Sequence, residues 1–463
     1  MRAEEALTEV DEVMVSPRPS GAPPPPPPPP RVIDLTAPAV EAPDEVIYLP
    51  EAEPGRLGPD FVRVWAAAAV SNAGDGVRLT ALPLLAAAVT RNPVAVSGIL
   101  LAGHLPWLLF SLPAGAIIDR LDRRKLVSRV SALRAIVMAL LCGVVVFGEA
   151  SLPALYAVAF LQGLGEVFSD NAVFALVPGV VPRDRLEDAN GRLESVVQVT
   201  NQFAGPAAGG FLFAHAAGLP FFVDALSFLA MALLVRGVKL RPDRNGLGAE
   251  EGTSERKSIR ADIAEGVRWL RARPALRNLS YIAALTNVAL NGTFAIFVLF
   301  ALEELGLSAT AFGVLLSIEA LGALGGCLLA SRIRKRFGIP VAITGALALA
   351  GLANLAIATT AAVPVIAAMM VAVAFAGGVW NVLTNSLRQA VTPDRLLGRV
   401  QSAHRLLSWG AIPFGTLLGG VAAHVYGLRA PFLIAALMLC ALAVGAFVNS
   451  EHLQPDYMAA PAR

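Results

Sequence analysis

Residues 94–148 read VAVSGILLAGHLPWLLFSLPAGAIIDRLDRRKLVSRVSALRAIVMALLCGVVVFG, and their pattern recurs along the chain. Two apolar runs, 94–117 and 126–148, flank a short segment crowded with Asp and Arg. Each run, as a helix, is long enough to cross the ~30 Å hydrocarbon core of a bilayer. The stretch therefore predicts two membrane-spanning helices joined by a charged connection that lies in water.

The composition of the 463 residues fits such a protein. Apolar residues make up 56% of the chain and charged residues 16%, and the mean hydropathy is +0.63. Soluble proteins carry about 25% charged residues because water must solvate their surface. A lipid-exposed surface removes that need. The net charge of +2 says little about partners, but no nucleic-acid-binding module is visible, so we expect no nucleic-acid partner.

Apolar segments of membrane-spanning length recur from residue 61 onward. Their number and even spacing predict an all-α integral membrane protein, with twelve transmembrane helices in two pseudo-symmetric six-helix bundles. The twelve segments are 62–90, 94–117, 126–148, 152–178, 187–213, 219–237, 276–301, 309–331, 339–360, 363–390, 397–423 and 428–449.

Positive charge gathers in alternate connections between these segments. One set holds the clusters 120–125 and 332–336, whereas the opposite set holds little beyond Arg91 and Arg429. Short loops rich in Lys and Arg remain in the cytoplasm. The excess of Arg and Ala over Lys is typical of high-GC bacterial genomes. We therefore expect a multi-pass protein of the bacterial inner membrane with both termini in the cytoplasm.

Three segments outside the bundles differ in character. Residues 1–60 are acidic and contain an unbroken proline tract at 23–30, which favours exposed polyproline II. No basic region followed by an apolar one resembles a signal peptide. We interpret 1–60 as a disordered cytoplasmic tail, with recruitment of a partner as the alternative, and 451–463 as a second cytoplasmic tail.

The third such segment, 238–275, is a cytoplasmic linker between an N-terminal bundle at 61–237 and a C-terminal bundle at 276–450. Within it, Ile259, Ile263 and Val267 recur at helical spacing on one apolar stripe. This predicts an amphipathic helix on the membrane face, with a simple tether as the alternative.

The two halves of the chain repeat each other. A constant offset of 210 residues relates several motifs in loops and helices, and an offset of 216 relates others near the start of each half. Internal duplication of a six-helix unit is the mark of transporters built from two related bundles. The pairs are Asp184-Arg185-Leu186 with Asp394-Arg395-Leu396, Gly205, Gly209 and Gly210 with Gly415, Gly419 and Gly420, Asn171 with Asn381, and Trp65, Asp75 and Gly76 with Tyr281, Asn291 and Gly292.

The segment 112–125, LPAGAIIDRLDRRK, resembles the signature of the major facilitator superfamily between its second and third helices. The resemblance implies that Gly115 allows close helix packing, and that an Asp and Arg cluster clasps the neighbouring bundle at the cytoplasmic face. A degraded copy at 326–336 lacks the Asp, so we expect an asymmetric clasp. The residues assigned to this gate are Gly115, Asp119, Arg120, Arg123, Arg124 and Asp170, of which Asp170 is expected to meet Arg120.

The segment 204–210, AGPAAGG, is similar to the antiporter motif of drug exporters, with Asn201 in place of its leading Gly. Segments 222–228 and 388–400 resemble the subgroup that contains the enterobactin exporter and the macrolide-efflux proteins. In one respect the chain departs from proton-coupled drug antiporters, because Ala159 stands where their fourth helix has an Arg. Proton coupling through that Arg is therefore excluded. The antiporter-like residues are Gly205, Pro206, Gly209 and Gly210 and their copies Gly415, Gly419 and Gly420.

Ionisable and amide side chains inside the predicted spans are the candidate site. A charge at the bilayer centre costs at least ~2.5–3.5 kcal/mol, so each needs a function or a partner. Asp75 lies near the middle of its span with Arg78 one turn away, and Asp224 is expected to be interfacial and structural. A structural ion pair and interhelical hydrogen bonds are the alternatives. The residues assigned to proton coupling or a central cavity are Asp75, Arg78, Glu166, Glu319, Asn287 and Asn291.

No phosphate-binding loop, nucleophile elbow or metal-ligand spacing occurs in the sequence. We therefore expect no enzyme, no cofactor and no metal. The leading hypothesis is a monomeric secondary transporter that exports an amphipathic drug, siderophore or secondary metabolite in exchange for protons. The alternatives are a lipid or lysophospholipid flippase and a non-transporting membrane receptor or assembly factor.

Overall fold

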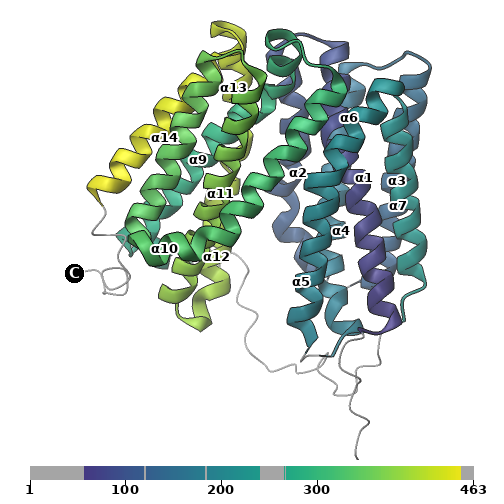
Figure 1. The fold of residues 1–463 in the computed structure, drawn as a ribbon. Helices are drawn as coiled ribbons and strands as arrows, with labels where there is room; N and C mark the ends of the chain where they lie inside the picture. Colours follow the sequence, from purple (N-terminus) through teal and green to yellow (C-terminus); the bar gives the residue numbers. More distant parts are fainter. Residues whose placement is uncertain (1–56, 119–120, 183–184, 240–264, 266, 450–463) are drawn as a thin grey trace, which may run out of the picture. The chain divides into compact units, whose positions relative to one another are not determined.

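The computed structural model describes residues 57–118, 121–182, 185–239, 265 and 267–449, and all the regular structure in them is helical. The tails at 1–56 and 450–463 and most of the 238–275 linker lie outside these residues. The first half contains α1 (Pro59–Val89), α2 (Pro93–Ile118), α3 (Arg123–Val146), α4 (Leu152–Val180), α5 (Leu186–Val197), the π-helical segment η2 (Gln198–Ala204), α6 (Gly205–His215) and α7 (Leu219–Arg236) (Figure 1).

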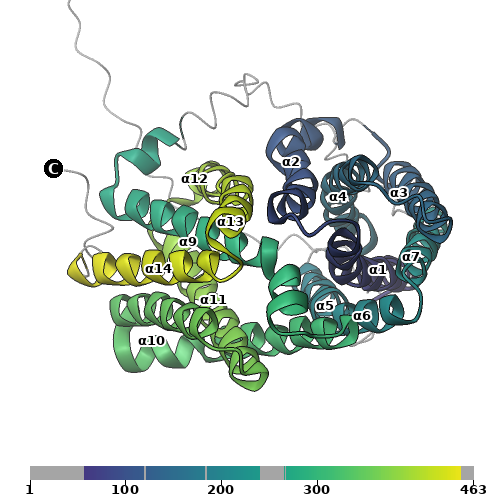
Figure 2. The same ribbon diagram turned by 90° about the horizontal axis from the view of Figure 1, so that it is seen from above.

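The second half repeats this order. It contains α9 (Pro274–Leu299), the π-helical segment η3 (Phe300–Glu304), α10 (Ala309–Thr359), α11 (Val363–Val391), α12 (Asp394–Trp409), α13 (Ile412–Tyr426) and α14 (Ala430–Val448). Seen from above, the helices α1–α7 gather in one group and α9–α14 in another (Figure 2).

Proline marks the start of many of these helices. In α1, α4, α6, α7, α9, α11, α13 and α14 a Pro lies in the first turn. A first-turn N–H has no partner inside its own helix, so Pro, which has none, fits there without loss. Most of the predicted span boundaries, which come from the lengths of the apolar runs, agree with the structure to within a few residues.

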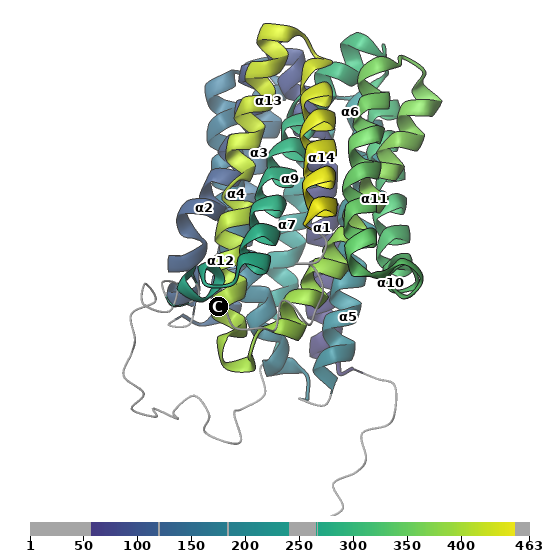
Figure 3. The ribbon, with the colours of Figure 1, turned by 90° about the vertical axis from the view of Figure 1, so that its left-hand side faces the viewer.

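The helices account for the twelve predicted spans. Nine described segments are long and apolar enough to cross a bilayer. One of them, α10, is two spans, because its backbone leaves the helical conformation at Gly338 (φ 78°). Figure 3 shows the chain turning back at the lower end of α10. Of the other two spans, α1 has its hydropathy lowered by Asp75 and Arg78, and α5–η2–α6 is interrupted by π turns.

Glycine lets the first and fifth spans of each half touch backbone to backbone. A Cβ at Gly205 on α6 would lie 2.5 Å from the Cα of Gly76 on α1. In the second half, a Cβ at Gly419 on α13 would lie 2.5 Å from the Cα of Gly292 on α9. Real Cβ atoms do not approach that closely, so both crossings require Gly.

The same two helices also carry the crossings between halves. A Cβ at Gly210 on α6 would lie 3.0 Å from the Cα of Gly313 on α10. A Cβ at Gly420 on α13 would lie 2.8 Å from the Cβ of Ser97 on α2. Gly420 is the repeat of Gly210 at offset 210, and Gly313 is the repeat of Ser97 at offset 216. The antiporter-like motif and its copy therefore make equivalent packing contacts.

The outward faces of the helices are apolar. On α3, Leu133, Ile136 and Leu140 lie on one face and are 62%, 56% and 65% exposed. Such a continuous exposed apolar surface is typical of a protein embedded in lipid. We call the end of the bundle that carries Arg124 and Arg334 the basic end, and the end that carries Arg91 and Arg429 the far end.

Candidate functional site

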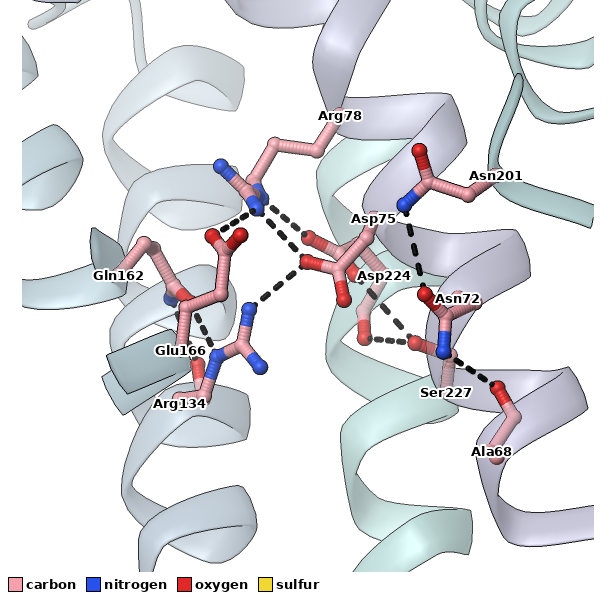
Figure 4. Close-up of polar contacts among 10 residues, drawn as sticks. All are labelled: Ala68, Asn72, Asp75, Arg78, Arg134, Gln162, Glu166, Asn201, Asp224 and Ser227. Carbon is pink, nitrogen blue, oxygen red and sulfur yellow. Dashed lines mark hydrogen bonds and ion pairs between the residues drawn. The ribbon is translucent and has the colours of Figure 1, made fainter. Parts of the chain in front are cut away.

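Asp75 is the centre of a buried charge network in the first half (Figure 4). Its Oδ1 accepts hydrogen bonds from Arg78 Nη2 and from Arg134 Nη2, each at 2.7 Å. The Asp75 side chain is only 12% exposed. Two guanidinium groups thus converge on one carboxylate oxygen, which is a stronger interaction than the single i,i+3 pair that the sequence suggested.

Arg134 on α3 belongs to this network although it was absent from the sequence-based candidates. Its Nε donates to Gln162 Oε1 at 3.0 Å, and Gln162 Nε2 donates back to the Arg134 carbonyl at 3.1 Å. Its guanidinium carbon lies 3.9 Å from the ring centre of Phe228. The arginine beside Gln162 on α4 therefore comes from α3. The signal was available, because Arg134 lies in the middle of a predicted span.

Arg78 is shared among three acids. Besides Asp75, its Nη2 lies 3.7 Å from Glu166 Oε2 on α4, and its Nε lies 3.5 Å from Asp224 Oδ2 on α7. Glu166 and Arg78 were both predicted site residues, and the structure brings them together with Asp75. Asp170, one helical turn beyond Glu166, lies within electrostatic reach of the same groups.

Asp224 was expected to be interfacial and structural, and its side chain is fully buried inside the protein. Ser227 Oγ donates to the Asp224 carbonyl oxygen at 2.8 Å and lies 3.3 Å from Asp224 Oδ1. Space for both side chains comes from Gly74 on α1, where a Cβ would collide with Ser227 and Asp224.

A cavity of about 200 Å³ adjoins the network and is lined by both halves. The first half contributes Asp75, Arg78 and Glu166, together with His104 and Trp107 on α2. The second half contributes an apolar wall that consists mainly of Phe294, Phe297, Phe312 and Leu316. The cavity is therefore charged on one side and aromatic on the other, which suits an amphipathic molecule.

The remaining predicted cavity residues do not join this network. Asn287 lines a second cavity, of about 440 Å³, within the second half, and its Nδ2 donates to the Ser408 carbonyl at 2.8 Å. Asn291 Nδ2 donates to the carbonyl of Asn287 on its own helix at 3.0 Å. Glu319 on α10 lines neither cavity and has no ion pair among the described residues.

The gate residues are described only in part. Asp119 and Arg120 lie outside the described residues, so the predicted contact of Asp170 with Arg120 stays a prediction. Arg123 Nη1 donates to the Ala175 carbonyl on α4 at 3.0 Å, and Arg124 Nη1 donates to the Val238 carbonyl at 3.1 Å. The basic cluster thus ties the start of α3 to α4 and to the end of the first half.

Asp122 precedes α3 and caps it, accepting a hydrogen bond from the Lys125 backbone N–H at 3.2 Å. Partial burial opposes its charge, but this hydrogen bond and the Lys125 ammonium outweigh that effect and lower the pKa of Asp122. The cap therefore stays charged at neutral pH and stabilises the first turn.

Most of the predicted amphipathic helix lies outside the described residues. Residues 267–271 are helical, and Leu270 is buried in the core of the second half. Arg399 on α12 forms an ion pair with Glu265 at 2.5 Å. The described end of the linker is therefore attached to the second half.

The sequence is similar to a known protein family and to known efflux proteins. Residues 58–459 match the family model described as transmembrane secretion effector. The multidrug efflux pump Tap of Mycolicibacterium fortuitum is 30% identical over 398 residues, covering 82% of this chain and 92% of the pump. Macrolide efflux protein A of Streptococcus pyogenes is 24% identical and covers 83% of this chain and 94% of its own length.

The fold also matches solved transporter structures. A bacterial homologue of the human lysosomal transporter Spinster, in an inward-facing and unoccupied conformation, superposes with a TM-score of 0.66 at 17% identity. The match covers 86% of this chain and 98% of that structure.

Proposed function

The chain belongs to the transmembrane secretion effector family of the major facilitator superfamily and is a secondary transporter for efflux, and we propose that protons drive its cargo outward through the cavity beside Asp75. Membership of this transporter family agrees with the expectation that the chain is not an enzyme. The proposal rests on one observation, the shared position of Arg78 among Asp75, Glu166 and Asp224 at the wall of that cavity.

The cargo that we propose is an amphipathic small molecule, such as a drug, a siderophore or a secondary metabolite. The charged wall from the first half and the aromatic wall from the second half support this, because such a molecule would contact both. The printed names of the relatives, a multidrug pump and a macrolide efflux protein, point to the same class of cargo.

The balance of charge supports the proposal of proton coupling. Two guanidinium groups, of Arg78 and Arg134, face the carboxylates of Asp75, Glu166 and Asp224. If cargo draws Arg78 away, Asp75 keeps only Arg134, and the acids that Arg78 neutralised are left in a low-dielectric site. A proton then replaces the lost positive charge. Return of Arg78 releases the proton, which is the exchange that an antiporter requires.

Orientation and conformation are part of the proposal. The basic end faces the cytoplasm, with both termini there, in the inner membrane of a bacterium. Several crossings between the halves lie toward the far end, where Gly210 meets Gly313, Gly420 meets Ser97, and Arg91 pairs with Glu303 at 3.2 Å. Contacts at that end suit a protein that is closed to the periplasm and works as a monomer by rocking one half against the other.

The rocking motion also requires a second state, which is closed to the cytoplasm, and we infer that the gate residues stabilise it. We assign Gly115, Asp119 and Arg120 to a clasp at the basic end that forms only in the state closed to the cytoplasm. Replacing Asp119 by Ala then abolishes cycling while leaving folding and cargo affinity intact, because it removes a contact made in one state alone. Normal turnover of Asp119→Ala protein would refute the assignment.

The coupling is tested with the full chain in lipid vesicles. Uptake of radiolabelled erythromycin, a macrolide, is measured in inverted vesicles with and without an imposed pH gradient. In Asp75→Asn protein the gradient-driven accumulation should vanish while downhill exchange survives. The control is Glu149→Gln, which makes the same acid-to-amide change at an exposed residue and should transport normally. Undiminished uphill transport by Asp75→Asn protein would leave Asp75 as a structural ion pair and transfer the role to Glu166 or Glu319.

A further inference from the structure

The cavity of the second half has an unusual balance of charge. Among its lining residues, three are basic and none is acidic. The basic residues are Arg388 on α11 and His404 and Arg405 on α12, and amides lie around them, including Asn287, Asn385 and Gln401. All of these groups can donate hydrogen bonds to an oxyanion, and a guanidinium does so with a fixed fork of N–H groups.

Arg388 is the key residue, because it is buried without an acidic partner. It is only 5% exposed, and it donates a hydrogen bond to Asn385 Oδ1. Its Nε has no hydrogen-bond partner among the described residues. Arg78 and Arg134 in the first half both bind carboxylates. Burying a charge without an ion of opposite sign costs several kcal/mol, so Arg388 requires a counter-ion that the described protein does not supply.

A second orphaned group lies in the same wall. Thr286 on α9 lines the cavity, and its buried Oγ1 has no hydrogen-bond partner among the described residues. Unsatisfied buried polar atoms are uncommon in proteins and need an explanation. Arg388 Nε and Thr286 Oγ1 belong to two helices that line one cavity. A ligand that accepts a hydrogen bond from each residue would explain both.

His404 is another polar group in the wall of this cavity. Its Nδ1 lies 2.9 Å from Ser280 Oγ, which also donates to the Leu276 carbonyl at 2.9 Å. These contacts connect α12 to α9 beside the cavity.

The cavity also has an aromatic part. Trp380 and Trp409 line it, and Arg405 lies over the Trp409 ring at 4.8 Å. Trp409 in turn packs edge to face against Trp107, which lines the cavity beside Asp75, with ring centres 6.2 Å apart. We propose that the second-half cavity binds an organic anion, whose phosphate or carboxylate is held by Arg388 and Thr286 and whose apolar body lies against the tryptophans.

This site is distinct from the proton-coupling network and does not depend on it. The anion can come from two sources, a free organic phosphate or carboxylate, or the headgroup of an anionic lipid. Both offer the same oxyanion chemistry, and the experiment separates them.

The test measures binding without any gradient. Purified full-length protein in phosphatidylcholine nanodiscs is titrated with 4-nitrophenyl phosphate, 4-nitrobenzoate and uncharged 4-nitrobenzyl alcohol, which share a ring that quenches tryptophan fluorescence. The two anions should bind saturably and the alcohol at least tenfold more weakly. In Arg388→Gln protein, anion affinity should fall roughly 10–100-fold, as expected for a lost charge-assisted hydrogen-bond pair. Arg334→Gln, which removes an exposed arginine at the basic end, is the matched control and should bind normally.

A second variant protects the test against misfolding of Arg388→Gln protein. Thr286→Val keeps the shape of the side chain and removes only the hydroxyl, and it should weaken anion binding several-fold. Repeating the titration in nanodiscs that contain phosphatidylglycerol separates the sources, since competition by this lipid in an Arg388-dependent manner identifies a headgroup site. If phosphatidylglycerol leaves the anion affinity of the unaltered protein unchanged, the site is one for free organic anions. Equal binding of the alcohol and the anions, or anion affinity that is unaffected in both variants, would overturn the proposal. Asp75→Asn protein should bind the anions normally, so failure of proton coupling is distinguishable.

Discussion

The two halves of this transporter share their helix packing and differ in their charges. Gly210 and Gly420 make equivalent crossings, 210 residues apart, to the opposite half. At the charged positions the correspondence ends, because Asp75 in the first half corresponds to Asn291 in the second. The first half holds interlocked ion pairs, whereas the cavity of the second holds basic groups and amides. Backbone packing constrains duplicated bundles tightly, and the cavity linings are free to diverge.

The largest expected effect comes from breaking the charge network in the first half. Arg134→Met leaves Asp75 short of one of its two guanidinium partners and leaves Gln162 Oε1 without its donor, which should destabilise the protein by about 3–5 kcal/mol. Arg388→Met in the second half should be neutral or stabilising, because no acid loses a partner. Thermal unfolding of the two variants in the same detergent measures the contrast. Similar losses in both would show that the halves do not differ in this way.

A double variant sharpens this test. If Arg134 acts through Asp75, the combination Asp75→Asn with Arg134→Met should be less destabilised than the sum of the single variants, since the uncompensated charge is gone. Additive losses would show instead that Arg134 stabilises the bundle mainly through Gln162 and Phe228.

A smaller effect should be equal in both halves. Gly210→Ala and Gly420→Ala place a Cβ against Gly313 and Ser97 respectively, and overpacking of this kind costs about 1–3 kcal/mol. Gly445→Ala on α14 is the control, because no atom lies within 4 Å of its Cβ and helical Gly to Ala gains about 0.5–1 kcal/mol. Unfolding temperatures of the three variants provide the comparison. A wide difference between Gly210→Ala and Gly420→Ala would break the equivalence of the crossings.

The smallest effect concerns the exposed ion pair between halves at the far end. Arg91 and Glu303 are 64% and 35% exposed, so their pair is worth at most about 1 kcal/mol and is weakened by salt. Arg91→Gln should therefore shift the unfolding temperature only slightly, and the shift should disappear at high salt. A large, salt-independent shift would mean that the pair, rather than the glycine crossings, holds the far end closed.

The spans could be predicted from the sequence because the length and hydropathy of an apolar run are local properties. The same local properties show how deep a side chain lies in its helix but not which neighbour it faces. For Asp224, the space that Gly74 on α1 leaves for its side chain could not be predicted from the sequence. Asp75 and Arg78 were predicted as a pair because they are adjacent on one helix. Arg134 contacts them from another helix, and only the packing reveals that contact.

The second cavity shows the same limit. Asn287 was selected from its spacing, but Thr286 and Arg388 become candidates only because their buried atoms lack partners. Whether a buried atom has a hydrogen-bond partner depends on how neighbouring helices pack, and the sequence does not show this. A search for arginines inside predicted spans would have found Arg388. It would also have found Arg134, and the sequence does not show that only Arg134 has an acidic partner.

The π-helical segment η2 has a consequence for how the fifth span can move. The N–H of Gly205 bonds five residues back, to Thr200, just before Pro206, which has no N–H of its own. A π turn holds a spare residue relative to an α turn. If the π turn became an α turn, α5 would rotate by about 100° about its axis. The glycine contacts of α6 with α1 and α10 would remain in place. The π turn therefore allows α5, at the basic end of the span, to rotate relative to α6. The glycine crossings of α6 at the far end need not change.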